Sequence, residues 1–249
     1  MTTESPRALY LTDSGGFGPQ GDLELSSDVL RTAAITKGFG RLIRIYRPEP
    51  TLAFSRRETH LPGFESAVTL AAGFGFAPVV RPTGGRAVSY DQSCLVMDVI
   101  DAVASRHLGQ QEAFAEAAGA ISRALSACGV DAQVGEIPGE YCPGAFSVNA
   151  RRTVKIAGIS QRVISGARLV SAMIPVSPSP LVVEALSAVY RTMKFEWDPD
   201  TFGSISNEAP AATFADLSGA IRQEFSPDGV VDMSFTHFTA STRVPHTIP

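Results

Sequence analysis

The chain has 249 residues, of which 44% are hydrophobic and 18% are charged, a composition that suits a globular protein with one large core. Its formal net charge of −4 gives no reason to expect that it binds nucleic acid or an anionic membrane. No apolar run approaches the roughly 18 residues that span a bilayer. Residues 1–13 lack the basic and apolar regions of a secretory signal, so we expect a cytoplasmic protein with no nucleic-acid or membrane partner.

Hydrophobic periodicity and turn-forming residues divide the first half of the chain. After a turn at residues 17–21, apolar residues recur at helical spacing from Leu23 to Lys37. A strand at residues 42–46 ends at the Pro48–Pro50 turn, and a short helix covers residues 64–72. Residues 78–81, 87–90 and 94–100 are β-prone. A long Ala-rich helix follows at residues 110–127 and ends near Gly129, which suits a left-handed cap.

The second half of the chain begins with more strands. They are predicted at residues 145–149, 154–160 and 168–175, and helices are predicted at 181–192 and 212–224. Pro/Gly-rich stretches at 175–180 and 197–210 indicate turns. Because strands dominate the middle and helices flank them, the fold class is α+β, with a mostly antiparallel β-sheet flanked by helices.

No repeat, low-complexity tract or obvious linker interrupts the chain. We therefore expect residues 1–249 to form a single domain. Its core should lie at about 20–205, with 206–249 as a C-terminal extension packed on that core.

Three cysteines, Cys94, Cys128 and Cys142, cannot all pair with one another and lack the spacing of a zinc site. We expect neither a disulfide scaffold nor a bound metal. Cys94 lies in an apolar strand and Cys128 at a helix end, where a thiol usually behaves as a small hydrophobe. Cys142 lies in a polar turn, Tyr141-Cys142-Pro143-Gly144, and is the best candidate for a reactive thiol. The alternative is a packed structural thiol.

The segment from Arg81 to Val88 joins two β-prone runs and contains Thr83, Gly84 and Gly85. Paired glycines allow positive φ and let the backbone approach a ligand closely. Their amides, with Arg81 and Arg86, would suit a carboxylate, phosphate or acyl oxygen. From the glycine pair alone, a hairpin turn that needs glycine for its geometry is the favoured explanation.

Lys155 is flanked by Val154 and Ile156 on a predicted strand that runs into Gly158. Ordinary alternation would point its ammonium to solvent. A functional position would instead place the ammonium beside an acyl carbonyl or phosphate, where developing negative charge needs a partner. Gly158 would then let a substrate chain lie against bare backbone.

Two segments carry these residues: Val80-Arg81-Pro82-Thr83-Gly84-Gly85-Arg86-Ala87-Val88-Ser89-Tyr90-Asp91 and Lys155-Ile156-Ala157-Gly158-Ile159-Ser160. Together they resemble the superfamily of lipoate-protein ligases, octanoyl transferases and biotin ligases. The first matches the glycine signature of that superfamily and the second its lysine signature. Departures stand at Val80, Arg86 and Tyr90, where the family has an arginine, a third glycine and a histidine. With Cys142 ahead of the lysine signature, the chain looks most similar to the cysteine-dependent octanoyl transferases.

The resemblance implies transfer of an octanoyl or lipoyl group to the lysine of a lipoyl domain through an acyl-cysteine intermediate. Carriers would be lipoyl-domain proteins (glycine cleavage H protein, E2 subunits), with acyl carrier protein as a possible donor and no cofactor. Catalysis would fall to Cys142 and Lys155. The implied binding residues are Arg81, Thr83, Gly84, Gly85, Arg86, Tyr90, Gly158, Ile159 and Ser160.

Two other functions are compatible with the same residues. An ATP-dependent lipoate ligase would use ATP and Mg²⁺ to form an acyl-adenylate in this pocket, with Cys142 dispensable. A non-catalytic relative would bind the acyl group without turnover, since kinship of fold does not guarantee activity. The sequence leaves open the natural acyl chain, its donor, its acceptor, the oligomeric state and the group that deprotonates the thiol.

Overall fold

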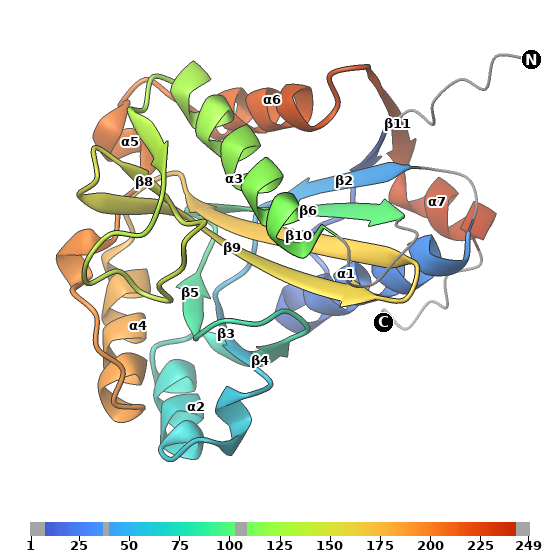
Figure 1. Cartoon of the computed structure of the whole chain (residues 1–249). Helices are drawn as coiled ribbons and strands as arrows, with labels where there is room; N and C mark the ends of the chain where they lie inside the picture. Colours follow the sequence, from blue (N-terminus) through green and yellow to red (C-terminus); the bar gives the residue numbers. More distant parts are fainter. Residues whose placement is uncertain (1–7, 37–39, 103–108, 243–249) are drawn as a thin grey trace, which may run out of the picture.

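A computed structural model describes residues 8–36, 40–102 and 109–242 (Figure 1). Its strands are β1 (Ala8–Thr12), β2 (Arg41–Tyr46), β3 (Thr51–Ser55), β4 (Ala77–Arg81), β5 (Val88–Tyr90), β6 (Cys94–Ala102), β7 (Ala132–Val134), β8 (Val148–Ala150), β9 (Val154–Ile164), β10 (Ala167–Pro175) and β11 (Val230–Ser234). Its α-helices are α1 (Gly18–Ile35), α2 (Phe64–Gly73), α3 (Gln110–Ala127), α4 (Pro180–Thr192), α5 (Ile205–Glu208), α6 (Phe214–Phe225) and α7 (Phe235–Thr242). Two short 3₁₀ turns cover Glu58–His60 and Pro199–Thr201.

Most of the strands form one sheet of eight, in the order β11-β1-β2-β6-β10-β9-β8-β7. From β2 to β7 every neighbouring pair is antiparallel, whereas β1 runs parallel to both β2 and β11. The expected fold class, α+β with a mostly antiparallel sheet flanked by helices, is confirmed. The parallel edge joins strands from opposite ends of the chain.

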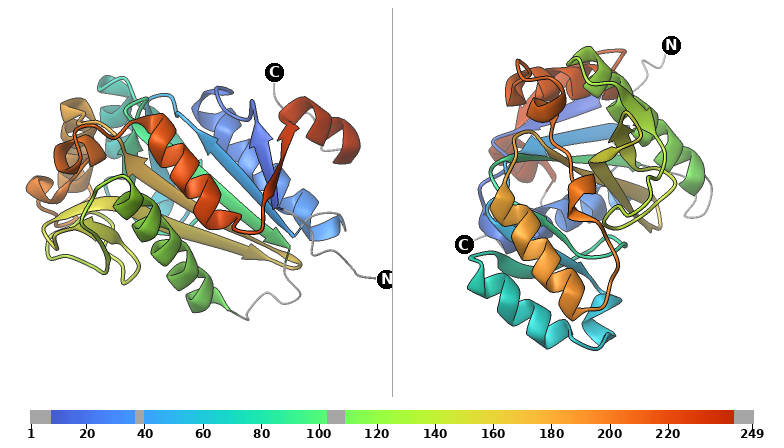
Figure 2. Two further views of the ribbon diagram at one scale, coloured as in Figure 1. Left: turned by 90° about the horizontal axis from the view of Figure 1, so that it is seen from above. Right: turned by 90° about the vertical axis from the view of Figure 1, so that its left-hand side faces the viewer.

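Helices cover both faces of this sheet. On one face α3 and α6 lie side by side (Figure 2) and pack Ile121 and Leu217 against Ile43 and Met97. On the other face α1 packs Leu25 and Val29 against residues such as Leu42 and Leu169. Because successive residues of a strand alternate between faces, β2 and β6 contribute to both cores.

A second, smaller sheet has the order β4-β3-β5. It packs with α2 and α4 below the large sheet (Figure 1), around Phe54, Ala71 and Leu186. The glycine segment connects β4 to β5, and β5 leads directly into β6 of the large sheet. This connection brings the glycine segment to the α1 face of the large sheet.

Most predicted elements appear close to their expected positions. The helix at 110–127 has the predicted bounds, and Gly129 after it has a φ of 91°. Two expectations are wrong: residues 17–21 mostly belong to α1, because Pro19 suits the first turn of a helix, and only the end of 145–149 is a strand. The 197–210 stretch contains α5 as well as turns. The predicted end of the first helix at Lys37 lies outside the described residues.

The C-terminal segment contacts the rest of the domain at two places. Strand β11 pairs with β1, and α6 packs on α3. The division into a core at 20–205 and an extension stays a prediction. In the described ranges, no helix has the length and apolar character needed to cross a membrane.

Candidate active site

A cavity of about 440 Å³ lies between the α1 face of the large sheet and two loops. One loop is the glycine segment after β4, and the other holds Cys142. Strands β6, β9 and β10 form its floor. Ten of the predicted site residues line this cavity: Arg81, Thr83, Gly84, Gly85, Tyr90, Cys142, Lys155, Gly158, Ile159 and Ser160. The fold thus brings together residues that lie far apart in the sequence.

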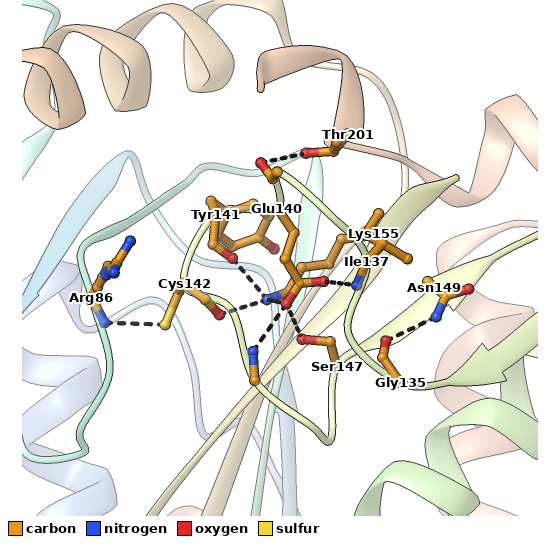
Figure 3. A network of polar contacts seen from close by, with 12 residues as sticks. Arg86, Gly135, Ile137, Glu140, Tyr141, Cys142, Ser147, Asn149, Lys155 and Thr201 are labelled. Atoms are coloured by element: carbon orange, nitrogen blue, oxygen red, sulfur yellow. Dashed lines mark hydrogen bonds and ion pairs between the residues drawn. The ribbon is translucent and has the colours of Figure 1, made fainter. Parts of the chain in front are cut away.

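Cys142 is held at the cavity by backbone groups of the glycine segment (Figure 3). Its Sγ accepts a hydrogen bond from the backbone N–H of Arg86 at 3.1 Å. Its own N–H donates to Tyr190 Oη at 3.0 Å, and that hydroxyl donates to the carbonyl of Ala87 at 3.1 Å. Cys142 has a φ of 42°, which costs free energy in a residue other than glycine and persists only where surrounding contacts fix it.

Gly85 makes the close approach of the two loops possible. It has a φ of 102°, and a Cβ there would lie 2.8 Å from Cys142 Sγ and 2.7 Å from a terminal nitrogen of Arg81. No side chain fits in that space. The hairpin-turn interpretation of the glycine pair is wrong, because β3 lies between β4 and β5 in the small sheet. The positive φ of Gly85 instead serves the site, since it admits the sulfur.

The carboxylate of Glu58 links the glycine segment to the end of β3 by hydrogen bonds. One carboxylate oxygen accepts the N–H of Ala87 at 2.7 Å, and the other accepts the N–H and hydroxyl of Ser55 at 2.6 and 2.9 Å. The residue is only 2% exposed. Sequence reasoning missed it, because Ser55-Arg56-Arg57-Glu58 has the composition of an ordinary charged surface turn.

Lys155 is 1% exposed, so the solvent-facing alternative is wrong. Its ammonium donates to Glu140 Oε1 at 3.1 Å and to the carbonyls of Tyr141 and Cys142, both at 2.9 Å (Figure 3). Burial lowers the pKa of Lys155, and the Glu140 carboxylate opposes that shift. A lysine has three N–H donors, and all three are committed to the loop that carries the thiol.

Glu140 was not predicted as a site residue, and it is the centre of that loop. Oε1 accepts the hydroxyl of Ser147 at 2.5 Å and the N–H of Gly144 at 3.2 Å, and Oε2 accepts the N–H of Ile137 at 3.2 Å. With Lys155 it forms a buried ion pair. The signal that could have found it is the buried lysine itself, because a buried charge needs a partner.

The remaining predicted residues differ in their placement. Ser160 donates to Thr83 Oγ1 at 2.9 Å, which ties β9 to the glycine segment. Arg81 donates to the carbonyl of Arg86 at 2.8 Å. The side chain of Arg86, in contrast, lies over the ring of Phe195, 5.0 Å from its centroid, and does not line the cavity. Only its backbone contributes.

The other two thiols are placed as ordinary hydrophobic residues. Burial raises the pKa of Cys94 to about 12, and it also raises the pKa of Cys128. Neither residue lines the cavity. Among the thiols, Cys142 is therefore the one available to a bound molecule.

No imidazole stands at this site in the described part of the chain. His60 and His237 do not line the cavity, and His107 and His246 lie outside the described residues. Across residues 8–36, 40–102 and 109–242, no group of three His, Cys, Asp or Glu side chains could hold a metal ion.

Comparison with known proteins gives a consistent set of relatives. The family model described as "Lipoyl protein ligase A/B catalytic domain" matches residues 28–239. An octanoyl-[GcvH]:protein N-octanoyltransferase of Geobacillus kaustophilus is 29% identical over 157 residues, which cover 62% of this chain and 55% of that protein. The enzyme of the same name from Anoxybacillus flavithermus is 30% identical over 172 residues, 67% of this chain and 61% of that protein. The chain thus spans less than two thirds of the length of these relatives.

Solved structures share the fold. A lipoate-protein ligase A bound with ATP has a TM-score of 0.71 at 18% identity, covering 96% of this chain and 92% of that one. Protein Ta0514 from T. acidophilum, solved with bound lipoic acid, has a TM-score of 0.72 at 16% identity, with the same coverage of 96% and 92%.

Proposed function

The chain belongs to the lipoyl protein ligase A/B catalytic domain family, as its two sequence signatures indicated, and we propose that it is an acyltransferase. It takes an octanoyl or lipoyl group from one carrier and places it on the lysine of a lipoyl domain, through a thioester on Cys142. The names of the relatives, octanoyl-[GcvH]:protein N-octanoyltransferases, support glycine cleavage H protein as the donor. An E2 lipoyl domain is the acceptor that we propose.

The observation that carries this proposal is the placement of Cys142. Its sulfur lines a cavity large enough for a medium-chain acyl group and receives the N–H of Arg86 at 3.1 Å. That hydrogen bond fixes the sulfur at the edge of the cavity, where a bound acyl carbonyl can approach it. A thiol kept only for packing would not need a strained backbone at the edge of a cavity.

In the first step the Cys142 thiolate attacks the acyl carbonyl of the donor. A C–S bond forms, the carbonyl oxygen becomes an oxyanion, and the bond to the donor nitrogen or sulfur then breaks as the oxyanion collapses to the thioester carbonyl, with a proton from solvent passing to that leaving group. Gly84 and Gly85 line the cavity, a Cβ on Gly85 would lie 2.8 Å from the sulfur, and the N–H groups of both residues make no hydrogen bond with the described residues. We assign them the task of stabilising the oxyanion.

In the second step the ε-amine of the acceptor lysine attacks the thioester. An amide bond forms, the C–S bond breaks, and the Cys142 thiolate is regenerated while the amine loses a proton to solvent. Dividing one difficult exchange between two amides into two easier transfers is the usual advantage of a covalent intermediate. This reaction consumes no ATP and needs no metal ion.

We assign Lys155 to positioning. Its three donors hold Glu140 and the carbonyls of Tyr141 and Cys142, so a contact with the acyl oxygen would require one of these bonds to break. The ammonium instead fixes the backbone on both sides of the nucleophile.

The test uses the full chain, octanoylated H protein and an apo E2 lipoyl domain, without ATP. Intact mass spectrometry should show one octanoyl group on Cys142 and then on the acceptor lysine. Cys142→Ser should abolish both signals. Cys128→Ser, which changes a thiol outside the cavity, is the matched control and should keep both.

Each rival function predicts a different result. Product that forms only from free lipoate with ATP and Mg²⁺, and forms equally well with Cys142→Ser, would establish a ligase and refute the transferase. A bound acyl group with no transfer to any lipoyl domain would indicate a non-catalytic binding protein.

A further inference from the structure

A row of polar side chains crosses the floor of the cavity. The antiparallel register pairs Arg44 of β2 with Asp98 of β6, Asp98 with Ser171 of β10, and Ser171 with Ser160 of β9. Paired residues on neighbouring strands share one face of the sheet. Asp98, Ser171 and Ser160 all line the cavity. These three residues are the polar row.

The cavity-lining residues of β6 and β10 on either side of the polar row are apolar. In one direction, two residues along each strand from the polar row, Val96 of β6 pairs with Met173 of β10, and Met173 pairs with Gly158 of β9. Two positions in the other direction, Leu169 pairs with Ile100 and with Arg162, and of these three residues Leu169 lines the cavity. Val96, Met173 and Leu169 also line the cavity. An acyl chain that follows this floor therefore passes from an apolar surface onto a polar one.

Two polar atoms of the row have no partner in the described part of the chain. Asp98 is 1% exposed; its Oδ2 accepts from Ser26 Oγ at 2.6 Å and Arg44 at 3.2 Å, while its Oδ1 makes no hydrogen bond. The hydroxyl of Ser171 makes none either. Because an unsatisfied buried polar group is costly, a plain hydrocarbon lying over these atoms would be penalised. A group that both donates and accepts would satisfy them.

The row lies at the distance of the far end of a medium-length acyl chain. Strands about 4.8 Å apart with a rise of about 3.4 Å per residue place Ser171 about 8 Å and Asp98 about 12 Å from Gly158. Gly158 lies beside the cysteine loop, since a Cβ there would be 3.6 Å from Tyr141 Oη. Seven carbon–carbon bonds of about 1.5 Å zigzag to a length of about 9 Å, so the last carbons of an octanoyl group reach the row.

We propose that Asp98 and Ser171 form a subsite for a hydroxyl group at the distal end of the acyl chain, an inference that rests on the proposed acyl transfer. The hydroxyl donates to Asp98 Oδ1 and accepts from Ser171 Oγ. The substrate class is then an ω-hydroxylated medium-chain acyl group, preferred over the unsubstituted chain.

The charges of the Arg44 cluster disfavour an acyl chain that ends in a carboxylate. Arg44 is fully buried and paired with both Asp22 and Asp98, so one cation faces two carboxylates. These three side chains therefore carry one excess negative charge in surroundings that screen it poorly. The other cations that line the cavity, Arg81 and Lys155, are hydrogen-bonded to the glycine segment and to the cysteine loop. A distal carboxylate would be repelled, whereas a neutral hydroxyl would not.

The test compares pantetheine thioesters of octanoate, 8-hydroxyoctanoate and suberate (octanedioate) as acyl donors to the full chain. Equimolar pairs compete, and intact mass spectrometry measures which acyl group loads Cys142. An apolar pocket rejects a hydroxyl strongly, so the direction of the preference is diagnostic. We expect 8-hydroxyoctanoyl to load in preference to octanoyl, and the suberyl thioester to load least.

Ser171→Ala removes one of the two partners and should reduce the hydroxyoctanoyl-to-octanoyl ratio about fivefold, the effect of one typical hydrogen bond. Ser187→Ala, on α4 and outside the cavity, is the matched control and should keep the wild-type ratio. A wild-type preference for octanoyl, or a ratio that Ser171→Ala leaves unchanged, would overturn the subsite.

The test distinguishes failure of the proposed acyl loading of Cys142 from failure of the proposed hydroxyl subsite. If octanoyl loads but hydroxyoctanoyl is rejected, the subsite is refuted and the proposed function stands. If neither thioester loads, the proposed function fails, and calorimetric titration with the two free acids still decides the subsite: tighter binding of octanoate would refute it.

Discussion

Replacing Lys155 by methionine tests whether the buried ion pair positions the nucleophile. The substitution keeps most of the apolar stem and removes the ammonium, leaving Glu140 as a buried carboxylate without its cation. Breaking a buried pair in this way typically costs about 3–5 kcal/mol. Glu140 keeps three other donors, from Ile137, Gly144 and Ser147, so we expect about 3 kcal/mol. That loss leaves a domain of ordinary stability folded.

A double-mutant cycle separates stability from rate. Glu140→Gln in the Lys155→Met background removes the uncompensated charge and should recover about 2 kcal/mol of the lost stability. The carbonyls of Tyr141 and Cys142 still lack their donor. Because a displacement of about 1 Å at a reacting group can cost about 100-fold in rate, octanoyl loading should stay about 100-fold slow in both the single and the double variant.

Urea unfolding of the four proteins gives the stabilities, and single-turnover loading followed by intact mass spectrometry gives the rates. The reasoning is refuted if the double variant recovers rate and stability together, since Lys155 would then act only by neutralising Glu140. A loss below about 1 kcal/mol in Lys155→Met would contradict the buried pair itself.

Three further predictions follow from local geometry. Gly85→Ala places a methyl group 2.8 Å from the sulfur of Cys142 at a φ of 102° and should abolish acyl loading. Gly84→Ala has nothing within 4 Å of its new Cβ, so in urea unfolding it should have the stability of the wild type. Iodoacetamide at neutral pH should label the cavity thiol and spare Cys94, whose pKa is raised to about 12 by burial; peptide mapping that finds Cys94 labelled in the native protein would contradict this. A hydrogen bond from Arg151 holds the pKa of Glu208 below its ordinary value of 4.5, so this stabilising contribution is complete above that pH and is lost as the pH falls through the lower folded value. Arg151→Ala should therefore weaken the acid dependence of the unfolding midpoint, and an unchanged pH profile would show that the pair contributes nothing.

Local signals in the sequence were enough for elements whose pattern is self-contained. The helix at 110–127 combines a long apolar periodicity with Gly129 at its end, and both features depend only on neighbours in the chain. The pairing of β1 with β11 could not be predicted in this way. It joins residues 8–12 to residues 230–234, and a five-residue strand carries no signal that identifies a partner so distant.

Prediction of the site had the same limit. Lys155 was recognised as unusual, but its partner was not, because Glu140 lies in a loop whose shape depends on contacts with β9. Asp98 and Ser171 are ordinary residues of two strands, and only the antiparallel register places them side by side. A shift of one residue would turn every side chain of a strand to the opposite face, so the polar row could not be inferred before the pairing was known.

The departure at Arg86 has a physical explanation that also shows what the glycine segment requires. The positive φ falls at Gly85, and Arg86 is not among the residues with positive φ, so a side chain is allowed there. That side chain leaves the cavity and lies over Phe195, while the backbone N–H remains to bind Cys142 Sγ. The constraint on this segment therefore acts on the backbone at two neighbouring positions: one must lack a Cβ so that the sulfur can approach, and the next must present its amide. An arginine meets the second requirement as well as a glycine does, which is why the substitution is compatible with a working nucleophile.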